Sequence, residues 1–241
     1  MRVYDNWNLA YDEIKRNVSE LGTTVHLQTM QDKNVKGDSE LGTTKELFGE
    51  SYTLTGVRAA DIVKWMYAHE YNVEWLIREF NERVAKNPTN PGTAWKFRKE
   101  VWKEFLHGGK FSYTYGLRMK KSLKYVIGEL KKRSSTRQAV LSVWDPNIDP
   151  QRMGKKRVPC SIFYQFLLRN DSSNRRVLHM VYVMRSSDIF THFPYDVALA
   201  LLLQEYVCDQ LSSPRKKVYP GNFVHFMTSC HAYATNLKGI F

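Results

Sequence analysis

The stretch CSIFYQFLLRNDSSNRRVLHMVYVM, residues 160–184, contains two apolar and aromatic runs with a polar segment between them. The two runs, residues 160–168 and 177–184, have the composition of buried β-strands. The segment 170–174 consists of turn-forming residues, so it predicts a hairpin loop that joins two neighbouring strands. A third run, residues 139–144, predicts another strand of the same sheet.

Helical segments surround this sheet along the chain. Helices are predicted by apolar residues at helical spacing, or by a long apolar run, in five segments: residues 5–20, 57–85 (one or two helices), 95–106, 117–133 and 195–211. Residues 45–55 predict a further strand. Helices followed by a sheet with helices packed on it predict an α+β, or mixed α/β, fold. Because 241 residues suffice for one well-buried core, we expect a single domain over residues 1–241.

The composition excludes several classes of protein. With 43% apolar, 13% aromatic and 25% charged residues, the chain has the balance of a soluble globular protein. Its longest apolar run, residues 197–203, is far shorter than the roughly 20 residues that span a bilayer, and its N-terminus has no apolar signal region. We therefore expect a cytoplasmic protein without a membrane partner. The three cysteines are odd in number and lack metal-ligand spacing, so neither a disulfide framework nor a metal site is predicted.

The net charge of +12 indicates an anionic partner. Nucleic acid and a phosphorylated metabolite would both be attracted, and basic runs such as residues 131–133, 155–157 and 215–217 are most often solvated surface. A basic nucleic-acid-binding protein, whose affinity would fall steeply with salt, is one alternative. The sequence contains no recognised nucleic-acid-binding motif, so we do not expect polymeric nucleic acid as the partner.

Cys160 is the candidate nucleophile. It begins a predicted strand and follows the basic run 155–157, and nearby positive charge favours the thiolate form of a cysteine. The alternative is a buried, inert cysteine, since free cysteines are among the most buried residues. That alternative is stronger for Cys208, which lies in an apolar helix, and for Cys230.

The segment Arg-Ser-Ser-Asp at residues 185–188 ends an apolar strand and suits an anion. The planar guanidinium of Arg185 and the neighbouring serine hydroxyls can donate several hydrogen bonds to a phosphate. The alternative is an ion pair between Arg185 and Asp188 at the strand end. Arg137, just before the strand at 139–144, is a second candidate phosphate ligand.

His231 and Tyr233 form the last candidate pair. They lie two residues apart in a predicted strand, so their side chains point to the same face and can hydrogen-bond one ligand. A purely structural pair explains the spacing equally well.

Taken in order, these fragments resemble the thymidylate synthase superfamily. The matching fragments are Pro-Cys (159–160), Tyr-Gln-Phe (164–166), Arg-Ser-x-Asp (185–188), Phe-Pro-Tyr-Asp-x-Ala (193–198), Gly-x-Phe (221–223) and His-x-Tyr (231–233). Upstream of Arg137 the resemblance is confined to Tyr115-Gly116 and to Glu79, which falls where the family has its catalytic glutamate. Glu74 and Glu70 lie close to Glu79 on the same predicted helix and remain alternatives.

The resemblance implies a thymidylate synthase-like domain that dimerises through its sheet and uses 5,10-methylenetetrahydrofolate as co-substrate. It implies four catalytic residues: Cys160, Glu79, Tyr115 and Asp196. It implies nucleotide binding by Arg137, Arg185, Ser186, Asp196, His231 and Tyr233, and folate binding by Asp188 and Trp102. In the family an arginine pair reaches the phosphate site of the partner subunit, whereas here the pair reads Arg137-Gln138, so one arginine is missing.

Asp196 decides the base. Family members that act on uracil have asparagine here, whereas deoxycytidylate hydroxymethylases of bacteriophages have aspartate, and the chain resembles the latter. The physical reason is separate: cytosine protonated at N3 offers two donors, which a carboxylate can accept together. The sequence therefore predicts dCMP as the nucleotide, and the resemblance implies a virus that replaces cytosine in its DNA as the natural setting.

Two products are possible, 5-hydroxymethyl-dCMP by addition of water or 5-methyl-dCMP by hydride transfer. The chain ends at Phe241, without the long C-terminal segment by which synthases close over the folate, and a less closed site should admit water. The family's usual histidine and glycine are replaced by Ser161 and Ser187. These departures favour the hydroxymethyl product, whereas Trp-Asp-Pro (144–146) and Trp102 resemble the synthases and favour methylation.

Overall fold

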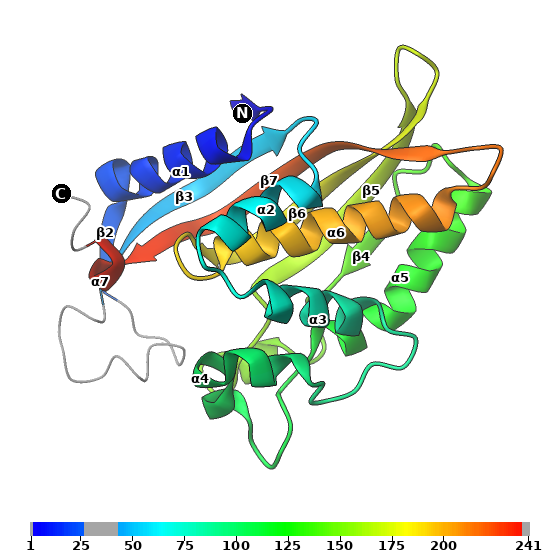
Figure 1. Ribbon diagram of the computed structural model, residues 1–241. Coiled ribbons are helices and arrows are strands. Elements are labelled where there is room, and N and C mark those ends of the chain that lie inside the picture. Colours follow the sequence, from blue (N-terminus) through cyan, green and yellow to red (C-terminus); the bar gives the residue numbers. More distant parts are fainter. Residues whose placement is uncertain (1, 27–42, 238–241) are drawn as a thin grey trace.

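The computed structural model describes residues 2–26 and 43–237, which form a mixed sheet with helices packed on it (Figure 1). Its strands are β1 (Arg2–Tyr4), β2 (Thr23–His26), β3 (Thr43–Leu54), β4 (Val140–Ser142), β5 (Ser161–Asn170), β6 (Arg176–Asp188) and β7 (Val218–Tyr233). The strand order is β1-β3-β7-β6-β5-β4, and β2 pairs with β3. The pairs β1–β3 and β6–β7 are parallel, and the other pairs are antiparallel. The predicted mixed α/β fold is confirmed.

The helices are α1 (Trp7–Leu21), α2 (Ala59–Ala68), α3 (Val73–Val84), α4 (Lys99–Trp102), α5 (Tyr115–Lys132), α6 (Phe193–Leu211) and α7 (Ala234–Leu237). The helix predicted over 95–106 is instead three short pieces, the 3-10 helix Ala94–Arg98, α4, and the 3-10 helix Lys103–Phe105. The break falls at Arg98, whose backbone leaves the helical region at φ −137° and ψ 50°. The Arg98 guanidinium packs against the rings of Trp75 and Tyr195, at 4.9 and 4.5 Å. Tertiary packing therefore overrides the local helical pattern.

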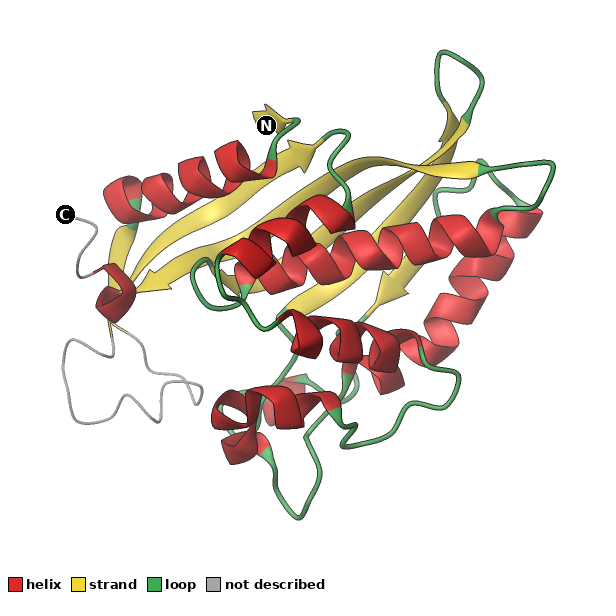
Figure 2. Cartoon of the chain, in the orientation of Figure 1, coloured by secondary structure: helices red, strands yellow, loops and turns green. Residues whose placement is uncertain are grey.

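The two faces of the sheet differ in burial, one being fully buried and the other half-buried. On β5 and β6 the side chains of Tyr164, Phe166, Met180 and Tyr182 are fully buried beneath the helical layer. Figure 2 shows α1, α2 and α6 crossing the same face of the sheet. The side chains that alternate with these on β5 and β6 are only partly buried, so the opposite face is less covered.

Helix α6 is the central helix of the domain and corresponds to the helix predicted over residues 195–211. It is apolar on nearly all sides, and most of its residues are buried, as expected for a helix enclosed by other elements. Pro194 lies in its first turn, where a missing N–H costs nothing. Gln204 anchors it to the sheet by donating to the carbonyl of Leu178 at 2.7 Å. This packing fixes the position of Asp196, one turn inside the helix.

No helix within residues 2–26 and 43–237 is long and apolar enough to cross a membrane.

Replacing Asp149 with alanine should destabilise the domain by about 3 kcal/mol, because it breaks a buried ion pair and leaves Arg118, among the described residues, only its longer ion pair with Asp145, at 3.6 Å. Asp149 is fully buried, and its Oδ1 accepts a hydrogen bond from Arg118 Nη2 at 2.6 Å. Its Oδ2 accepts from the backbone N–H of Asp145 at 2.8 Å. For a domain of this size, the melting temperature measured by thermal unfolding should fall by roughly 6–12 °C.

The matched control is Glu74→Ala, which removes an ion pair with Arg78 in which both side chains are about half exposed. This control substitution should lower the free energy of unfolding by at most about 0.5 kcal/mol. Equal melting temperatures for the two variants would contradict the structural role assigned to Asp149.

Candidate active site

A cavity of about 330 Å³ lies where the ends of β6 and β7 meet the first turns of α5 and α6. Most of the predicted site residues line it: Glu79, Trp102, Tyr115, Cys160, Ser186, Asp188, Asp196, His231 and Tyr233. Neither Arg185 nor Arg137 lines it, but Arg185 contacts Cys160, which does. The structure therefore brings together side chains that are more than 150 positions apart in the sequence.

Strand pairing explains this convergence. The parallel pairing of β6 with β7 places Ser186 beside Ser229 and Asp188 beside His231. The start of β5 meets the end of β6, where the N–H of Arg185 donates to the carbonyl of Cys160 at 2.9 Å. The nucleophile candidate and the anion-binding segment are therefore neighbours.

Arg185 supplies positive charge beside the Cys160 thiol. Its Nη2 lies 3.6 Å from Cys160 Sγ. Its Nε donates to the carbonyl of Pro159 at 2.9 Å, and Nη2 also approaches the carbonyl of Val158 at 3.3 Å. These bonds fix the guanidinium at the start of β5, so the alternative ion pair with Asp188 is wrong within the described residues.

The other two cysteines lie away from the cavity. Cys208 and Cys230 are buried, whereas Cys160 is partly exposed. Burial raises the pKa of Cys208 to about 12 and also raises the pKa of Cys230. Both therefore remain thiols at neutral pH, in agreement with their predicted inert role.

Glu79 is held by a buried arginine that the sequence did not single out. Arg83, one turn further along α3, donates from Nε to Glu79 Oε1 at 2.9 Å, and its guanidinium lies 3.8 Å from the centre of the Tyr115 ring. Burial is the largest influence on the pKa of Arg83 and lowers it, but Glu79 and the nearby tyrosines together raise it more, so the net shift is upward. Of the three alternative glutamates, only Glu79 lines the cavity; Glu74 and Glu70 are exposed.

Tyr115 is oriented by a chain of hydroxyl groups. Its hydroxyl lies 3.0 Å from Ser161 Oγ, which in turn lies 2.6 Å from the hydroxyl of Tyr182. Ser161 is fully buried. Burial also raises the pKa of Tyr115 well above its ordinary value, so the phenol stays protonated. Ser161 thus fixes the direction of a hydroxyl that borders the cavity.

Asp196 offers a carboxylate that no other described residue binds. Burial raises its pKa to about 7, although Arg83, Arg157 and Arg98 act in the opposite direction. No hydrogen bond or ion pair reaches this carboxylate from residues 2–26 or 43–237. The group is therefore available to a ligand that can supply donors and a proton.

The residues predicted to hold the sugar lie at one edge of the cavity. His231 Nδ1 is 3.5 Å from Ser186 Oγ and 3.4 Å from Ser229 Oγ. The rings of His231 and Tyr233 meet edge to face with their centres 5.7 Å apart. His231 Nδ1 thus adjoins the segment that carries Arg185.

Part of the cavity wall is aromatic. Trp102 stacks on Trp75 with ring centres 6.1 Å apart, and the Arg157 guanidinium lies 4.1 Å from the centre of the Trp102 ring. On the polar side Asp188 Oδ1 accepts from the backbone N–H groups of Phe190 and Thr191, at 3.1 and 3.3 Å. An aromatic wall can pack against a flat ring, and the adjacent Asp188 carboxylate can accept hydrogen bonds from amino groups on that ring.

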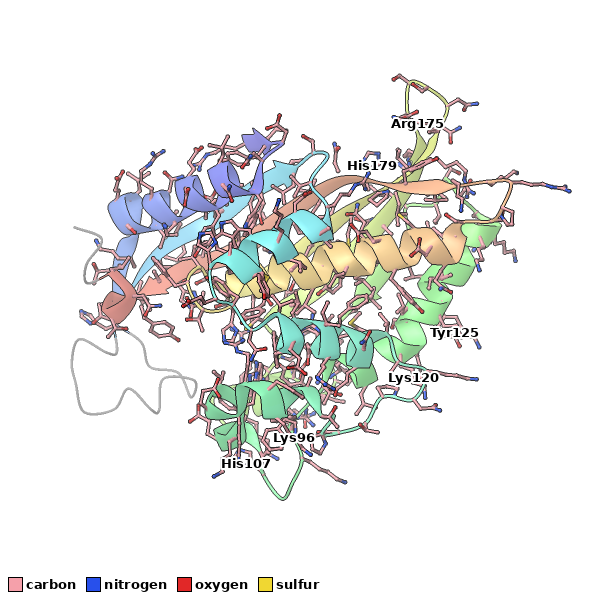
Figure 3. The ribbon with its side chains drawn as sticks, in the orientation of Figure 1. Lys96, His107, Lys120, Tyr125, Arg175 and His179 are labelled. Carbon is pink, nitrogen blue, oxygen red and sulfur yellow. The ribbon has the colours of Figure 1, made fainter. Side chains whose placement is uncertain are left out.

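Most of the basic side chains lie elsewhere. The runs 131–133 and 215–217 are exposed, and Lys96 and Lys120 point away from the body of the protein in Figure 3. From the run 155–157 only Arg157 lines the cavity. The basic runs are therefore solvated surface, as predicted, with the exception of Arg157.

Comparisons with known proteins identify the family of this chain. The thymidylate synthase family model matches residues 17–240. The chain is 28% identical to a protein of Methanocaldococcus jannaschii over 171 residues, 66% of this chain and 72% of that protein. It is 25% identical to the thymidylate synthase of Mycoplasma pneumoniae over 215 residues, 82% of this chain and 68% of that protein.

The fold is also similar to that of a solved structure, thermostable thymidylate synthase A from Bacillus subtilis. The TM-score is 0.68 with 14% sequence identity, and the superposition covers 98% of this chain and 82% of that one. Because the family model spans nearly all of the sequence, the chain belongs to the thymidylate synthase family.

Proposed function

We propose that this protein transfers a one-carbon unit from 5,10-methylenetetrahydrofolate to C5 of dCMP and releases 5-hydroxymethyl-dCMP. The observation that carries the proposal is that the Asp196 carboxylate borders the same cavity as Cys160. Cys160 supplies the nucleophile that the family's chemistry needs, and Asp196 supplies an acceptor pair that suits protonated cytosine.

In this proposal the nucleotide lies along the polar edge of the cavity. Arg185 and Ser186 donate to the phosphate, and His231 and Tyr233 contact the 3′-hydroxyl of the sugar. The cytosine ring then reaches Asp196, which accepts from the protonated N3 and the 4-amino group. A negative charge at this point also favours N3 protonation, which makes the ring a better electron sink.

The reaction begins with attack of the Cys160 thiolate on C6 of the pyrimidine. The new S–C6 bond transfers the electron pair of the C5=C6 bond to C5, which becomes the carbon nucleophile. After C5 has gained the one-carbon unit, its proton passes to ordered water served by Glu79, near the neutral Tyr115 hydroxyl. With expulsion of tetrahydrofolate, this proton loss leaves an exocyclic methylene at C5. Arg83 keeps Glu79 in place through the 2.9 Å ion pair.

The lining residues have the chemistry that a folate requires. Trp102 provides a flat apolar surface, and Asp188 is a carboxylate with one oxygen, Oδ2, that accepts no hydrogen bond from the described chain. When bound, the folate supplies the methylene carbon and, for a methyl product, the hydride.

Reductive methylation to 5-methyl-dCMP is the second candidate. It is favoured by Trp102, which lines the cavity as a synthase tryptophan would, and by relatives that are named thymidylate synthases. The two candidates share every step up to the exocyclic methylene at C5, and they differ only in whether water or hydride attacks it.

The decisive experiment incubates the protein with dCMP, or separately with dUMP, and 5,10-methylenetetrahydrofolate, and records the product mass and the oxidation state of the folate. Hydroxymethylated dCMP with tetrahydrofolate supports the proposal, and methylated dCMP with dihydrofolate supports the second candidate. No turnover of either nucleotide, combined with salt-sensitive binding of polymeric nucleic acid, would favour a nucleic-acid-binding protein instead.

We further propose a homodimer formed through the sheet face opposite the helices. Partly buried apolar side chains such as Phe163, Val181 and Val183 lie on that face, and Phe226 is 37% exposed there. Arg137 is exposed and lies outside the cavity of its own chain, so it is available to the phosphate site of a second copy.

Subunit complementation tests this arrangement. Arg137→Ala and Cys160→Ala should each be nearly inactive, because one lacks a phosphate ligand and the other the nucleophile. Mixing them should restore activity, since a heterodimer pairs one intact Cys160 with an Arg137 from the other chain. Two inactive variants that stay inactive after unfolding and refolding together would contradict a shared site.

A further inference from the structure

His192 is a titratable side chain of the cavity that the proposed mechanism does not use. It lines the cavity, and its ring centre lies 6.3 Å from that of Trp102. It occupies the position before α6, where a side chain often caps the helix, but it makes no capping hydrogen bond. Within residues 2–26 and 43–237, no hydrogen bond holds its imidazole.

The backbone places His192 between two residues with assigned partners. Its N–H donates to the carbonyl of Asp188 at 3.1 Å, and its own carbonyl accepts from the N–H of Asp196 at 2.9 Å. These two backbone hydrogen bonds link the end of β6 to the first turn of α6 through His192, and all three residues line the cavity. If Asp188 faces the folate and Asp196 the base, His192 faces the space where the one-carbon unit is transferred.

The surroundings keep the imidazole neutral. Burial lowers the pKa of His192 to about 3, and Arg98, Arg157 and His231 act in the same direction. A neutral imidazole has one donor and one acceptor nitrogen, whereas the charged form has no acceptor. His192 can therefore accept a hydrogen bond from a water molecule at neutral pH.

We infer that His192 holds the water molecule that attacks the exocyclic methylene at C5 and thereby directs the reaction to the hydroxymethyl product. This inference rests on the proposed function and adds the residue that decides between its two candidate products.

The step balances with the groups present. The water oxygen bonds to the exocyclic carbon, and the electron pair of the exocyclic double bond re-forms C5=C6. The S–C6 bond breaks, and Cys160 leaves as a thiolate. One water proton passes to the acceptor nitrogen of His192 and then to solvent. Even a weakly basic imidazole suffices, because the oxygen becomes strongly acidic as it attacks carbon.

The test needs no folate, because the same step runs in reverse. Incubated with 5-hydroxymethyl-dCMP in ¹⁸O-labelled water, the protein should form the Cys160 adduct, expel the hydroxyl and add labelled water, so that mass spectrometry detects ¹⁸O in the nucleotide. His192→Phe keeps a ring against Trp102 but has no acceptor. Its exchange should be slower by on the order of 100-fold, as for loss of a general base. His192→Gln keeps an acceptor and should be slowed less.

In the complete reaction with dCMP and 5,10-methylenetetrahydrofolate, His192→Phe should shift the product from hydroxymethyl toward methyl. Equal exchange rates for the wild type and His192→Phe, whether both are fast or both are absent, would overturn the role of His192. A wild type that makes no one-carbon product from dCMP would overturn the proposed function instead, and with it this inference. Loss of dCMP affinity in His192→Phe, measured by calorimetry, would assign His192 to nucleotide binding and also overturn its role.

Discussion

Cys160→Ser should lower the rate of product formation from dCMP by on the order of 10⁴-fold or more, because a hydroxyl is a far weaker nucleophile than a thiolate at neutral pH. The Arg185 guanidinium lies 3.6 Å from Cys160 Sγ, so a positive charge adjoins the attacking atom. A serine hydroxyl at the same position stays protonated and attacks carbon only weakly. The measurement is the rate of product formation in a single turnover, with the product detected by mass spectrometry.

Binding should separate the chemical role of Cys160 from a structural one. Serine is similar in size, and the phosphate contacts assigned to Arg185 and Ser186 remain, so calorimetry should give a dCMP affinity close to that of the wild type. The matched control is Cys208→Ala, which removes a thiol from the buried part of α6 outside the cavity and should retain turnover. Full activity of Cys160→Ser would rule out a mechanism in which Cys160 forms a covalent adduct.

The sheet was predictable because its central strands carry long, regular patterns. β5 and β6 alternate buried and partly buried residues over ten or more positions, and such a pattern is a strong signal. β1 and β2 have three and four residues, too few for a period to emerge. Their positions depend on pairing with β3, which no local sequence pattern encodes.

The helix predicted over 95–106 was wrong for a different reason. Its local spacing is helical, but Arg98 turns inward to pack on Trp75 and Tyr195, and the backbone follows. Tertiary packing of this kind outweighs local propensity, which amounts to less than about 1 kcal/mol for most residues.

The candidate site was predictable only where a residue belonged to an ordered set of fragments. Asp196 came from such a set and Glu79 from its expected place upstream of it, but Arg83 and His192 came from neither, although each lies four residues from one of them. Polar residues in helices are usually solvated, so nothing local marks these two as buried or cavity-lining. A search for charged or imidazole side chains one turn from each candidate would have found both.

Asp196→Asn should reverse the base preference, from dCMP toward dUMP. An amide offers one acceptor and one donor, which match O4 and N3–H of uracil, but it places a donor against a donor of protonated cytosine. A site whose buried polar group is left unpaired by one base discriminates strongly, so the ratio of kcat/KM for dCMP over dUMP should fall by on the order of 10³-fold. The measurement is steady-state competition between the two nucleotides.

Asp188→Asn is the matched control for this substitution. It neutralises another carboxylate of the cavity, one that also interacts with Asp196 electrostatically. Because Asp188 is assigned to the folate and not to the base, this variant should lower turnover without reversing the preference. An unchanged preference in Asp196→Asn would remove the basis for dCMP as the substrate.

The raised pKa of Asp196 gives the base assignment a signature in pH. Burial raises this pKa to about 7, and the bound state contains one proton shared between the carboxylate and N3 of cytosine. Below about pH 7 the free site already carries that proton, so dCMP affinity should be nearly constant. Above pH 7 the proton must be taken up on binding, and the affinity should fall about tenfold for each further pH unit. In Asp196→Asn this pH dependence should vanish, because no group at this position titrates; a persisting decline would assign the proton to another residue.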